Sequence, residues 1–471
     1  MSNAMQQKSG VSLRRIAGFA CNQGFVFFLF YTGLNRSLTI GSFTLERADL
    51  LGTLLFVVIG FVALRLISER GREIMRSRPA CLLYALMLSS GSLIANLVAN
   101  DGALWLVVES MLIGLSFALF LSTWGNAFES VTTKVSVPEV FLGSLFGALF
   151  GLIIEFMPFD HADLAFRILP FFSAAALLVH VPVGLVGTSR TPAEADTSTT
   201  TLLSRKIMAG TAFFGLAAGF METFNTSPGM PAMPTYAVAF VLFIAFALGT
   251  LSLLMSDGFG KGAALHKAYR LALFILLLGF LLVPAPVFAD SLVSGEAIVL
   301  AGYLGLTAVL ISLFLVLAKI TDTSTSMSFS RGFSALFGGE LLGVLFANLL
   351  NTTQINLETP YLVVVIAGAL VLFSYVFLFT ERDFQNLSEI VINTDSFEER
   401  CKALAEQFAL SNREAEILPF ALKGRTSERI AQELYISKST VDTHLKRIYT
   451  KTKVHNRQEL IDLSEKNMSA T

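Results

Sequence analysis

The sequence predicts an all-α membrane protein: a polytopic bundle of twelve transmembrane helices (6+6) followed by a four-helix helix-turn-helix domain. Three observations support this fold class. Hydrophobic residues make up 54% of the 471 residues and charged residues only 15%, whereas soluble domains carry about 25% charged residues. Long apolar stretches recur along the first 380 residues. After residue 380, charged residues become dense and short amphipathic patterns replace the apolar ones.

The apolar stretches have the length of membrane-spanning helices, which need roughly 20 mostly apolar residues. A large soluble helical protein is a poor alternative, because its helices would need a polar face that these stretches lack. The twelve stretches cover residues 16–34, 48–67, 80–99, 103–124, 137–157, 164–187, 206–224, 235–255, 269–289, 296–318, 332–350 and 360–380.

The connections between these stretches alternate in charge, and cytoplasmic loops are enriched in Lys and Arg. The N-terminal tail and the loops after even-numbered stretches are basic, whereas the odd loops contain few basic residues besides Arg36, Arg47 and Arg167. The alternation predicts a multi-pass protein of the inner (cytoplasmic) membrane with both termini and the C-terminal domain in the cytoplasm. Trp105 and Trp124 flank the fourth stretch, as interfacial anchors would.

Changes in polarity divide the chain into segments. The polar stretch Thr188–Thr201 separates six apolar stretches from six. The predicted segments are a first six-helix half at 11–187, a cytoplasmic central loop at 188–205, a second six-helix half at 206–380, a linker at 381–403 and a helix-turn-helix domain at 404–466.

Corresponding loops of the two halves share an acid, a glycine and a base, in Ser68–Arg72 (SERGR) and Ser256–Lys261 (SDGFGK). An acid here can cap a helix, while glycine permits a tight turn. The pattern resembles the loop motif of the major facilitator superfamily, which implies a transporter-like two-lobed bundle. The first copy has Glu in place of Asp and is one residue shorter, and the second lacks the Arg.

Small residues recur at four-residue spacing in two stretches that occupy corresponding places in the halves. Such stripes let a neighbouring backbone approach closely. They indicate either static tight packing or a surface between the two lobes that lets them rock. The residues are Gly143, Gly147 and Gly151 in the fifth stretch and Gly339, Gly343 and Ala347 in the eleventh.

The tail contains two helices joined by the three residues Tyr435–Ser437, which is the spacing of a helix-turn-helix unit. Ser411 and Ser427 are expected to cap the first two helices, the third begins at Lys438, and a fourth begins near Asn456. One small core is expected from Ile417, Ile430, Ala431, Leu434, Ile436, Val441, Leu445 and Ile448.

The segment 404–466 resembles the LuxR-type (NarL-type) effector domain, which implies a transcription regulator that binds double-stranded DNA as a homodimer. Asp442 stands where relatives often have Lys, and Arg429 replaces the usual Glu. In this family the fourth helix, here with Leu460 and Ile461, forms the dimer face. The family pattern is matched at Leu410, Ser411, Arg413, Glu414, Glu416, Lys423, Gly424, Ile430, Ala431, Leu434, Ile436, Ser437, Thr440, Val441, His444, Asn456 and Arg457.

The polar outer face of the third helix supplies the predicted DNA contacts. Between Lys438 and Arg457, six basic residues accompany one acid, which is the charge footprint of a nucleic-acid-binding surface. Thr443 and Lys446, one turn apart, are predicted to read base edges, and Lys438 either bases or phosphates. Phosphate contacts, which position a domain without reading sequence, are predicted for Ser439, Thr440, Arg447 and Lys451.

Ionisable residues inside the predicted spans are the candidates for an effector site, because a charge in hydrocarbon is costly. Glu155 and Glu340 are preferred, since each lies on a helix with a small-residue stripe. His180 and Glu109 are further candidates, and Glu222 lies near the end of the seventh stretch. Each side chain can equally well have a purely structural pairing.

The chain has no Walker loop, GxSxG or HExxH motif, and its three cysteines lie far apart. We therefore expect no enzymatic activity, cofactor or metal site. The leading hypothesis is a membrane-bound one-component transcription regulator, with a transporter-like sensor coupled to the DNA-binding domain. The alternative is a functional secondary transporter with an attached regulatory tail. The expected partners are double-stranded DNA, the lipid bilayer, an unidentified small-molecule effector and a second copy of the chain on DNA.

Overall fold

The computed structural model divides into two compact units, a larger one within residues 1–388 and a smaller one that contains Glu389–Thr471. The residues that the structure describes are 11–31, 35–41, 43–97, 103–129, 131–180, 197–223, 235–256, 263–284, 293–321, 323–352, 359–378, 380, 383, 397 and 400–466.

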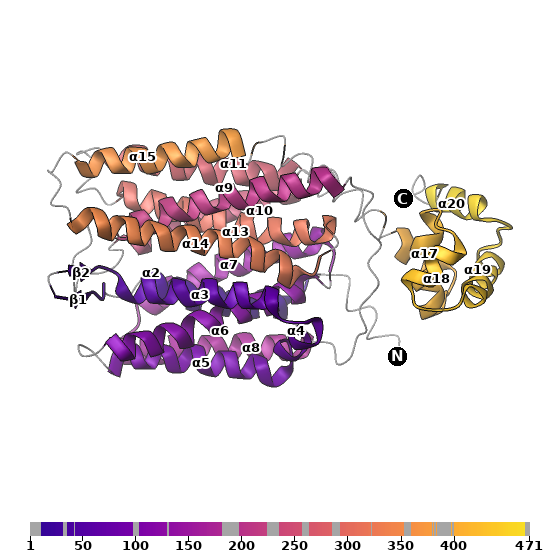
Figure 1. Ribbon diagram of the computed structural model, residues 1–471, viewed down its shortest axis with the longest axis horizontal. Coiled ribbons are helices and arrows are strands. Elements are labelled where there is room, and N and C mark those ends of the chain that lie inside the picture. The colour runs from indigo at the N-terminus through magenta and orange to yellow at the C-terminus, as the bar shows by residue number, and fades with distance from the viewer. Residues whose placement is uncertain are drawn as a thin grey trace. The chain divides into compact units, whose positions relative to one another are not determined.

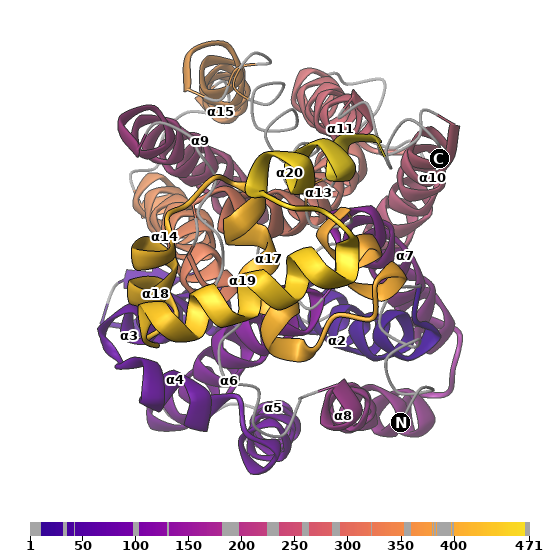
Figure 2. The same ribbon diagram turned by 90° about the vertical axis from the view of Figure 1, so that its right-hand side faces the viewer.

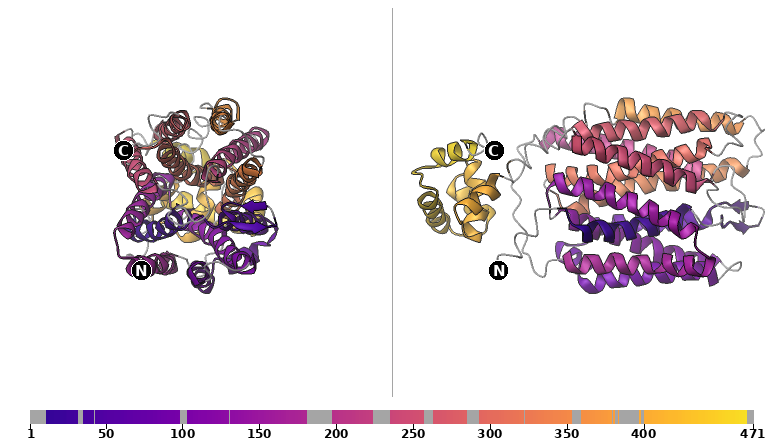
Figure 3. Two further views of the ribbon diagram at one scale, coloured as in Figure 1. Left: turned by 90° about the vertical axis from the view of Figure 1, so that its left-hand side faces the viewer. Right: turned by 180° about the vertical axis from the view of Figure 1, so that it is seen from behind.

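Helices form nearly all of the described part of the larger unit, and they run roughly along one direction (Figures 1 and 3). In chain order they are α2 (Leu13–Tyr31), α3 (Ala48–Leu66), α4 (Glu69–Met75), α5 (Arg78–Leu97), α6 (Ala103–Glu129), α7 (Thr133–Glu155), α8 (Phe159–His180), α9 (Thr197–Thr223), α10 (Tyr236–Ser256), α11 (Ala263–Leu282), α13 (Gly295–Ile320), α14 (Thr325–Thr352), α15 (Thr359–Phe373) and the π-helical η2 (Ser374–Leu378).

Eight of the described helices are long and apolar enough to cross a membrane, and two shorter apolar helices accompany them. Large apolar side chains such as Leu281 (71% exposed) and Leu349 (58%) lie on the outside of the unit, where lipid would cover them. The chain is therefore a multi-pass membrane protein, and the prediction of a helical fold is confirmed. Several helix ends differ from the predicted stretches: α9 begins at Thr197, inside the predicted central loop, and α14 begins at Thr325 rather than at residue 332.

A two-stranded antiparallel hairpin, which the apolar pattern of the sequence does not predict, joins α2 to α3. Strand β1 (Leu38–Ile40) pairs with β2 (Phe43–Leu45), with Leu38 opposite Leu45. Gly41 has a φ of +64° in the turn, a conformation that suits glycine. Strands of three residues are too short to give a readable alternation, so only the structure reveals them.

Glycines bring two pairs of helices into backbone contact, α7 with α2 and α14 with α9, and the helices of each pair lie side by side in Figure 2. A Cβ on Gly147 of α7 would lie 2.9 Å from the backbone nitrogen of Gly24 in α2. A Cβ on Gly339 of α14 would lie 2.0 Å from the carbonyl oxygen of Ala212 in α9. Gly143 and Gly147 pack on α2, and Gly339 and Gly343 pack on α9, so these four glycines lie within their own half. Gly151 instead faces α10 of the other half, since a Cβ there would lie 2.8 Å from the ring of Phe240.

Valine at Gly339 is expected to lower the melting temperature of the purified protein, because α9 must move to admit the new side chain. Overpacking a tight contact costs about 1–3 kcal/mol. Gly338→Val is the matched control: a Cβ there meets no atom within 4 Å. Thermal unfolding in detergent should separate the two variants, and an equal loss in both would contradict this packing.

Trp124 lies in the interior of the larger unit. Helix α6 continues to Glu129, so Trp124 does not end a span; its side chain is 1% exposed, and its indole N–H donates to the hydroxyl of Ser173 at 2.9 Å. The interpretation as an interfacial anchor is therefore wrong for Trp124. Trp105, near the start of α6, is 45% exposed.

The loop motif Ser68–Arg72 forms the start of α4 rather than a tight turn. The hydroxyl of Ser68, not the neighbouring acid, caps this helix by accepting from the Gly71 N–H at 3.3 Å. Gly71 is needed for its size, since a Cβ would lie 2.3 Å from the Cγ2 of Ile67. The second motif passes out of the described residues after Ser256.

Polar contacts tie α14 to the first part of the chain near both of its ends. Near its start, the guanidinium of Arg65 in α3 donates to the carbonyl oxygen of Ser330 at 2.8 Å. Near its other end, the amide of Asn348 accepts from the backbone N–H of Glu46 at 2.6 Å and donates to the Glu46 carbonyl at 3.1 Å. Residues far apart in sequence are thereby joined at two places along one helix.

The described part of the smaller unit is helical, and its core contains every residue predicted for it, with Ile436 partly buried. Residue Thr426, rather than Ser427, caps α18, through a hydrogen bond from the Arg429 N–H at 3.3 Å. The helices are a segment at 400–407 followed by α17 (Asn412–Leu422), α18 (Ser427–Glu433), α19 (Lys438–Thr452) and α20 (Arg457–Lys466).

Candidate nucleic-acid interface and buried membrane site

Helix α19 is the predicted recognition helix, and the core fixes which of its faces points outward. Val441 and Ile448 are fully buried and Leu445 nearly so, against residues of α17 and α18. The spacing of these three residues gives α19 one apolar stripe. The opposite face carries exposed side chains: Lys438, Ser439, Asp442, Thr443, Lys446, Arg447, Thr450 and Lys451.

All seven residues predicted to contact DNA therefore lie on α19, six of them exposed and Thr440 half-buried. Lys446 and Thr443 are neighbours on the exposed face. The hydroxyl of Thr443 donates to the carbonyl oxygen of Ser439 at 2.8 Å. With its proton directed along the helix, Thr443 presents an acceptor and a methyl group outward, which suits a base edge.

The first turn of α19 gathers hydroxyl groups around unsatisfied backbone N–H donors. Ser437 caps the helix by accepting from the Thr440 N–H at 3.1 Å. Its hydroxyl also lies 2.8 Å from that of Ser439 and 2.7 Å from that of Thr440. Hydroxyls at the positive end of a helix are a favourable environment for a phosphate group, which agrees with the predicted roles of Ser439 and Thr440.

Lys438 stands at the start of α19 with its ammonium group 2.5 Å from a carboxylate oxygen of Glu428 in α18. Both side chains are exposed. The hydrogen bond to Glu428 raises the pKa of Lys438, so the lysine stays charged under physiological conditions. An exposed ion pair of this kind opens at little cost, and Lys438 is then available to DNA.

Lys451 is partly committed to the domain itself. Its ammonium group donates to the buried carboxylate of Glu414 at 2.6 Å and to the carbonyl oxygen of Ala409 at 3.0 Å. Glu414 also completes a capping box with Ser411 at the start of α17. An ammonium group has three donors, so a phosphate contact by Lys451 would use the one beyond these two.

Glu414 is expected to make this domain sensitive to acid. Burial by itself raises the pKa of Glu414, but the hydrogen bonds from Lys451 and Ser411 outweigh it, and the pKa is lower than usual. A lowered pKa in the folded state contributes stability above the unfolded-state value of about 4.3, which is lost as the pH falls through the folded-state value. Unfolding of residues 396–471 should therefore become easier below about pH 4.3.

The matched variant is Glu414→Gln, which should lose about 1.5–3 kcal/mol at neutral pH, the contribution of hydrogen bonds to a charged group. Its stability should also depend less on pH between 5 and 3 than that of the wild-type domain. Urea unfolding at several pH values measures both effects, and parallel pH profiles for the two proteins would contradict the assignment.

Leu460 is fully buried in the core of the domain, whereas Ile461 is only partly buried. Leu460 therefore does not belong to an exposed dimer face as predicted. Helix α20 begins after Asn456, whose side-chain oxygen accepts from the Glu459 N–H at 2.9 Å.

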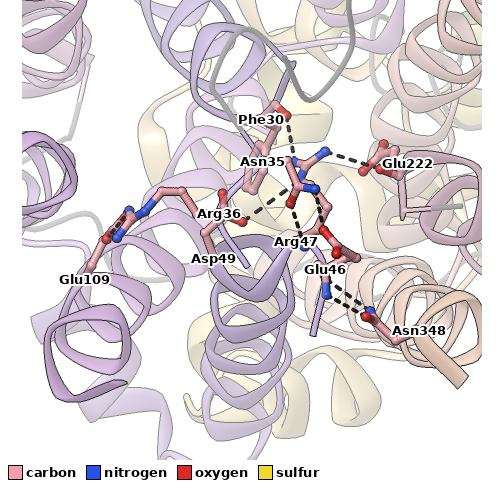
Figure 4. Close-up of polar contacts among 9 residues, drawn as sticks. All are labelled: Phe30, Asn35, Arg36, Glu46, Arg47, Asp49, Glu109, Glu222 and Asn348. Carbon is pink, nitrogen blue, oxygen red and sulfur yellow. Dashed lines mark hydrogen bonds and ion pairs between the residues drawn. The ribbon is translucent and has the colours of Figure 1, made fainter. Parts of the chain in front are cut away.

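In the larger unit, Arg47 is the centre of a buried polar network (Figure 4). The side chain is 2% exposed, and its guanidinium donates to the carbonyl oxygens of Phe30 at 3.1 Å and Glu222 at 3.4 Å. These carbonyls belong to the last turns of α2 and α9. The backbone N–H of Arg47 donates to Asn35 at 2.8 Å. One side chain thus satisfies the C-terminal ends of two helices that carry partial negative charge.

Glu340 and Glu222 lie in the electrostatic neighbourhood of Arg47. Glu340 is 4% exposed and accepts a hydrogen bond from the hydroxyl of Tyr303 at 2.7 Å. Glu222 is 3% exposed, and neither of its carboxylate oxygens has a hydrogen-bond partner in the part of the chain that the structure describes. The structure therefore brings Glu222, which the sequence places near the end of a span, close to Glu340 and adds Arg47 and Tyr303 to this candidate site.

The remaining effector candidates do not join this site. Glu109 accepts two hydrogen bonds from Arg36, at 2.8 and 2.6 Å, and forms a separate ion pair with it (Figure 4). The side chains of Glu155 and His180 lie outside the described residues. Among the sequence candidates, Glu340 is the one that the structure places among other buried ionisable groups.

Comparisons with known proteins bear mainly on the C-terminal segment. Residues 409–464 match the family model described as "Bacterial regulatory proteins, luxR family". The chain is 38% identical over 71 residues to "Uncharacterized response regulatory protein YgeK" of Escherichia coli (strain K12), covering 14% of this chain and 48% of that protein. It is 46% identical over 52 residues to "Monoamine regulon transcriptional regulator" of Klebsiella aerogenes, covering 11% and 23%. The chain thus spans less than half the length of these relatives.

Among solved structures, the chain is similar to "Crystal structure of a Major Facilitator Superfamily (MFS) transporter, FucP, in the outward conformation", with a TM-score of 0.45 and 12% identity over 80% of this chain and 97% of that chain. It is also similar to "Crystal structure of a bacterial homologue of iron transporter ferroportin in outward-facing state", with a TM-score of 0.46 and 11% identity over 80% and 98%.

The helical order, the capped recognition helix and the family match agree for one part of the chain. Residues 409–464 form a helix-turn-helix domain of the luxR family of bacterial regulatory proteins.

Proposed function

We propose that this protein is a membrane-bound one-component transcription regulator, in which a transporter-like bundle of twelve spans senses a small-molecule effector and controls a luxR-type DNA-binding domain. The observation that carries the proposal is the exposed, basic face of α19, on a chain that also crosses a membrane. DNA binding accounts for the exposed basic face. Because the same chain crosses a membrane, a signal sensed in the membrane can act on the DNA-binding domain without a second protein.

The proposed orientation places both termini and the DNA-binding domain in the cytoplasm, with the bundle in the inner membrane. The three arginines that break the charge alternation are all engaged. Arg36 pairs with Glu109 at 2.6 Å and Arg167 with Asp163 at 2.6 Å, while Arg47 is buried against carbonyl oxygens. Because their charge is locally compensated, they weigh little against the basic loops.

The proposed organisation follows the predicted segments: six-helix halves at 11–187 and 206–380, with the DNA-binding domain at 404–466. The equivalent packing of α7 on α2 and of α14 on α9 supports two related halves, as repeated six-helix units would give. On DNA we propose a homodimer, in which Thr443 and Lys446 read bases and the other polar residues of α19 hold phosphates.

The effector is proposed to act at the buried site around Glu340. A ligand shifts a two-state equilibrium only if it binds the two states with different affinity. Glu340, Arg47 and Glu222 come from segments far apart in the chain, so a change in their relative positions alters the site. That dependence gives an effector the required difference between states.

The DNA-binding part of the proposal is tested with residues 396–471, purified alone and titrated with promoter DNA. The core of the smaller unit is contained almost entirely in this fragment. Binding should weaken steeply with salt, as it does when phosphate contacts release counterions. A fragment that folds but binds neither specific nor nonspecific DNA at low salt would sink the regulator function.

The membrane part is tested by reconstitution in liposomes. A sensor should show no substrate uptake, whereas uptake that is lost in the Glu340→Gln variant would identify a functional transporter with a regulatory tail. A reporter gene fused to the target promoter, in cells that express the full chain, then measures whether transcription changes when candidate effectors are added.

A further inference from the structure

Glu222 and Glu340 are brought together by a close crossing of two helices. A Cβ on Gly219 of α9 would lie 2.0 Å from the carbonyl oxygen of Glu340 in α14, so the backbones touch at this point. Glu222 follows Gly219 by three residues and therefore lies on the same face of α9. The two acidic side chains thus lie close enough to interact electrostatically inside a membrane unit, where an unpaired negative charge is costly.

The carboxylate of Glu222 is the unusual member of this pair. It is 3% exposed, and both of its oxygens lack a hydrogen-bond partner among the described residues. Buried carboxylates are normally paired or hydrogen-bonded, because an uncompensated buried charge is strongly unfavourable. Glu340, by contrast, has one oxygen bonded to the Tyr303 hydroxyl at 2.7 Å.

The hydrogen bonds of the Arg47 guanidinium go to backbone carbonyl oxygens rather than to the Glu222 carboxylate. Its guanidinium donates to the carbonyl oxygens of Phe30 and Glu222, and its Nε lies 3.9 Å from a carboxylate oxygen of Asp49. It therefore compensates the negative ends of α2 and α9. When Glu222 and Glu340 are both ionised, the single guanidinium beside them leaves one negative charge unbalanced.

We propose that Glu222 and Glu340 form a binding site for a small monovalent cation, either an inorganic ion or the ammonium group of a small amine. A single positive charge balances the excess, and the two oxygens of Glu222 are acceptors that such a ligand can use. The proposal rests on the sensor function above and names the class of its effector. The backbone carbonyl of Glu222 accepts a hydrogen bond from Arg47, which also donates to Phe30 in α2. A cation bound at Glu222 would therefore lie next to the contact that joins α9 to α2.

The test measures thermal unfolding of the purified full chain while sodium chloride or methylammonium chloride replaces N-methyl-D-glucamine chloride at constant ionic strength. At least one of the two cations should raise the melting temperature saturably, by roughly 2–4 °C well above its dissociation constant. A response to sodium alone identifies an inorganic ion, and a response to methylammonium identifies an amine. No response to either cation overturns the proposal.

The Glu222→Gln variant should lose the response while keeping a cation-free melting temperature at or above that of the wild type, because glutamine removes the uncompensated charge. This second measurement shows that the variant is folded. Asp163→Asn is the matched control, since its acid is on α8 and pairs with Arg167; it should respond like the wild type. An unchanged response in Glu222→Gln would overturn the proposal.

DNA binding distinguishes this site from the proposed function. If the cation stabilises the full chain through Glu222 but leaves promoter binding unchanged, the cation site stands and the sensing function falls. If promoter binding responds to an effector in cells but the cation response survives in Glu222→Gln, the cation site falls and the regulator stands.

Discussion

Alanine at Lys446 is expected to weaken promoter binding by about 1–3 kcal/mol, roughly 5- to 150-fold, and to relax discrimination at one base pair. Lys446 is exposed on the outer face of α19, one turn after Thr443. A lysine at this position can donate to the acceptors of guanine in the major groove. Competition binding with a series of single-base-pair variants of the promoter measures both effects.

Arg447→Ala is the matched control on the same exposed face. If Arg447 holds a phosphate, its removal weakens binding to all sequences equally and reduces the slope of the salt dependence by about one. Neither residue contributes to the buried core, so both variants should unfold like the wild-type domain. Indistinguishable sequence profiles for the two variants would mean that Lys446 does not read a base.

Methionine at Arg47 is expected to destabilise the membrane unit by about 3–5 kcal/mol, the cost of removing one partner of a buried charged network. The substitution leaves the carbonyl oxygens of Phe30 and Glu222 without their donor. It also removes the cation nearest to Glu222 and Glu340. Thermal unfolding in detergent, followed by the loss of the elution peak of the folded protein, measures the effect.

A second substitution identifies the electrostatic part of this loss. Adding Glu222→Gln to Arg47→Met should restore part of the melting temperature, because it removes a carboxylate that Arg47 no longer accompanies. Arg70→Met is the control for losing an arginine from the same unit; Arg70 is exposed, so a loss of about 0.5 kcal/mol or less is expected. Strictly additive losses in the double variant would contradict a shared network.

The sequence predicts the buried core of the smaller unit almost residue by residue. The positions of Val441, Leu445 and Ile448 give the buried stripe of α19, and the exposed face follows from it. Helical periodicity carries this information, because a short helix in a small domain has one buried side. The prediction for Leu460 is wrong for a different reason. It comes from family resemblance rather than from periodicity, and packing of α20 against α17 buries the residue.

The membrane site is less predictable, because it depends on contacts between distant segments. Hydropathy marks Glu340 and Glu222 as unusual but cannot tell which acids meet. In the sequence, Arg47 stands out only as a basic residue in a loop where few are expected. The structure shows that it is buried beside the two acids. Similarly, the glycine spacing predicts close helix contact, but only the structure shows that α14 approaches α9.

Helix α14 is bonded to the first part of the chain through Ser330 and through Asn348. Eighteen residues separate these positions, or about 27 Å at 1.5 Å per residue. A stiff rod held at two such distant points cannot slide, but it can tilt about either one when the other is released. A displacement of Glu340 relative to the first part of the chain therefore requires that the contacts at one end of this helix break.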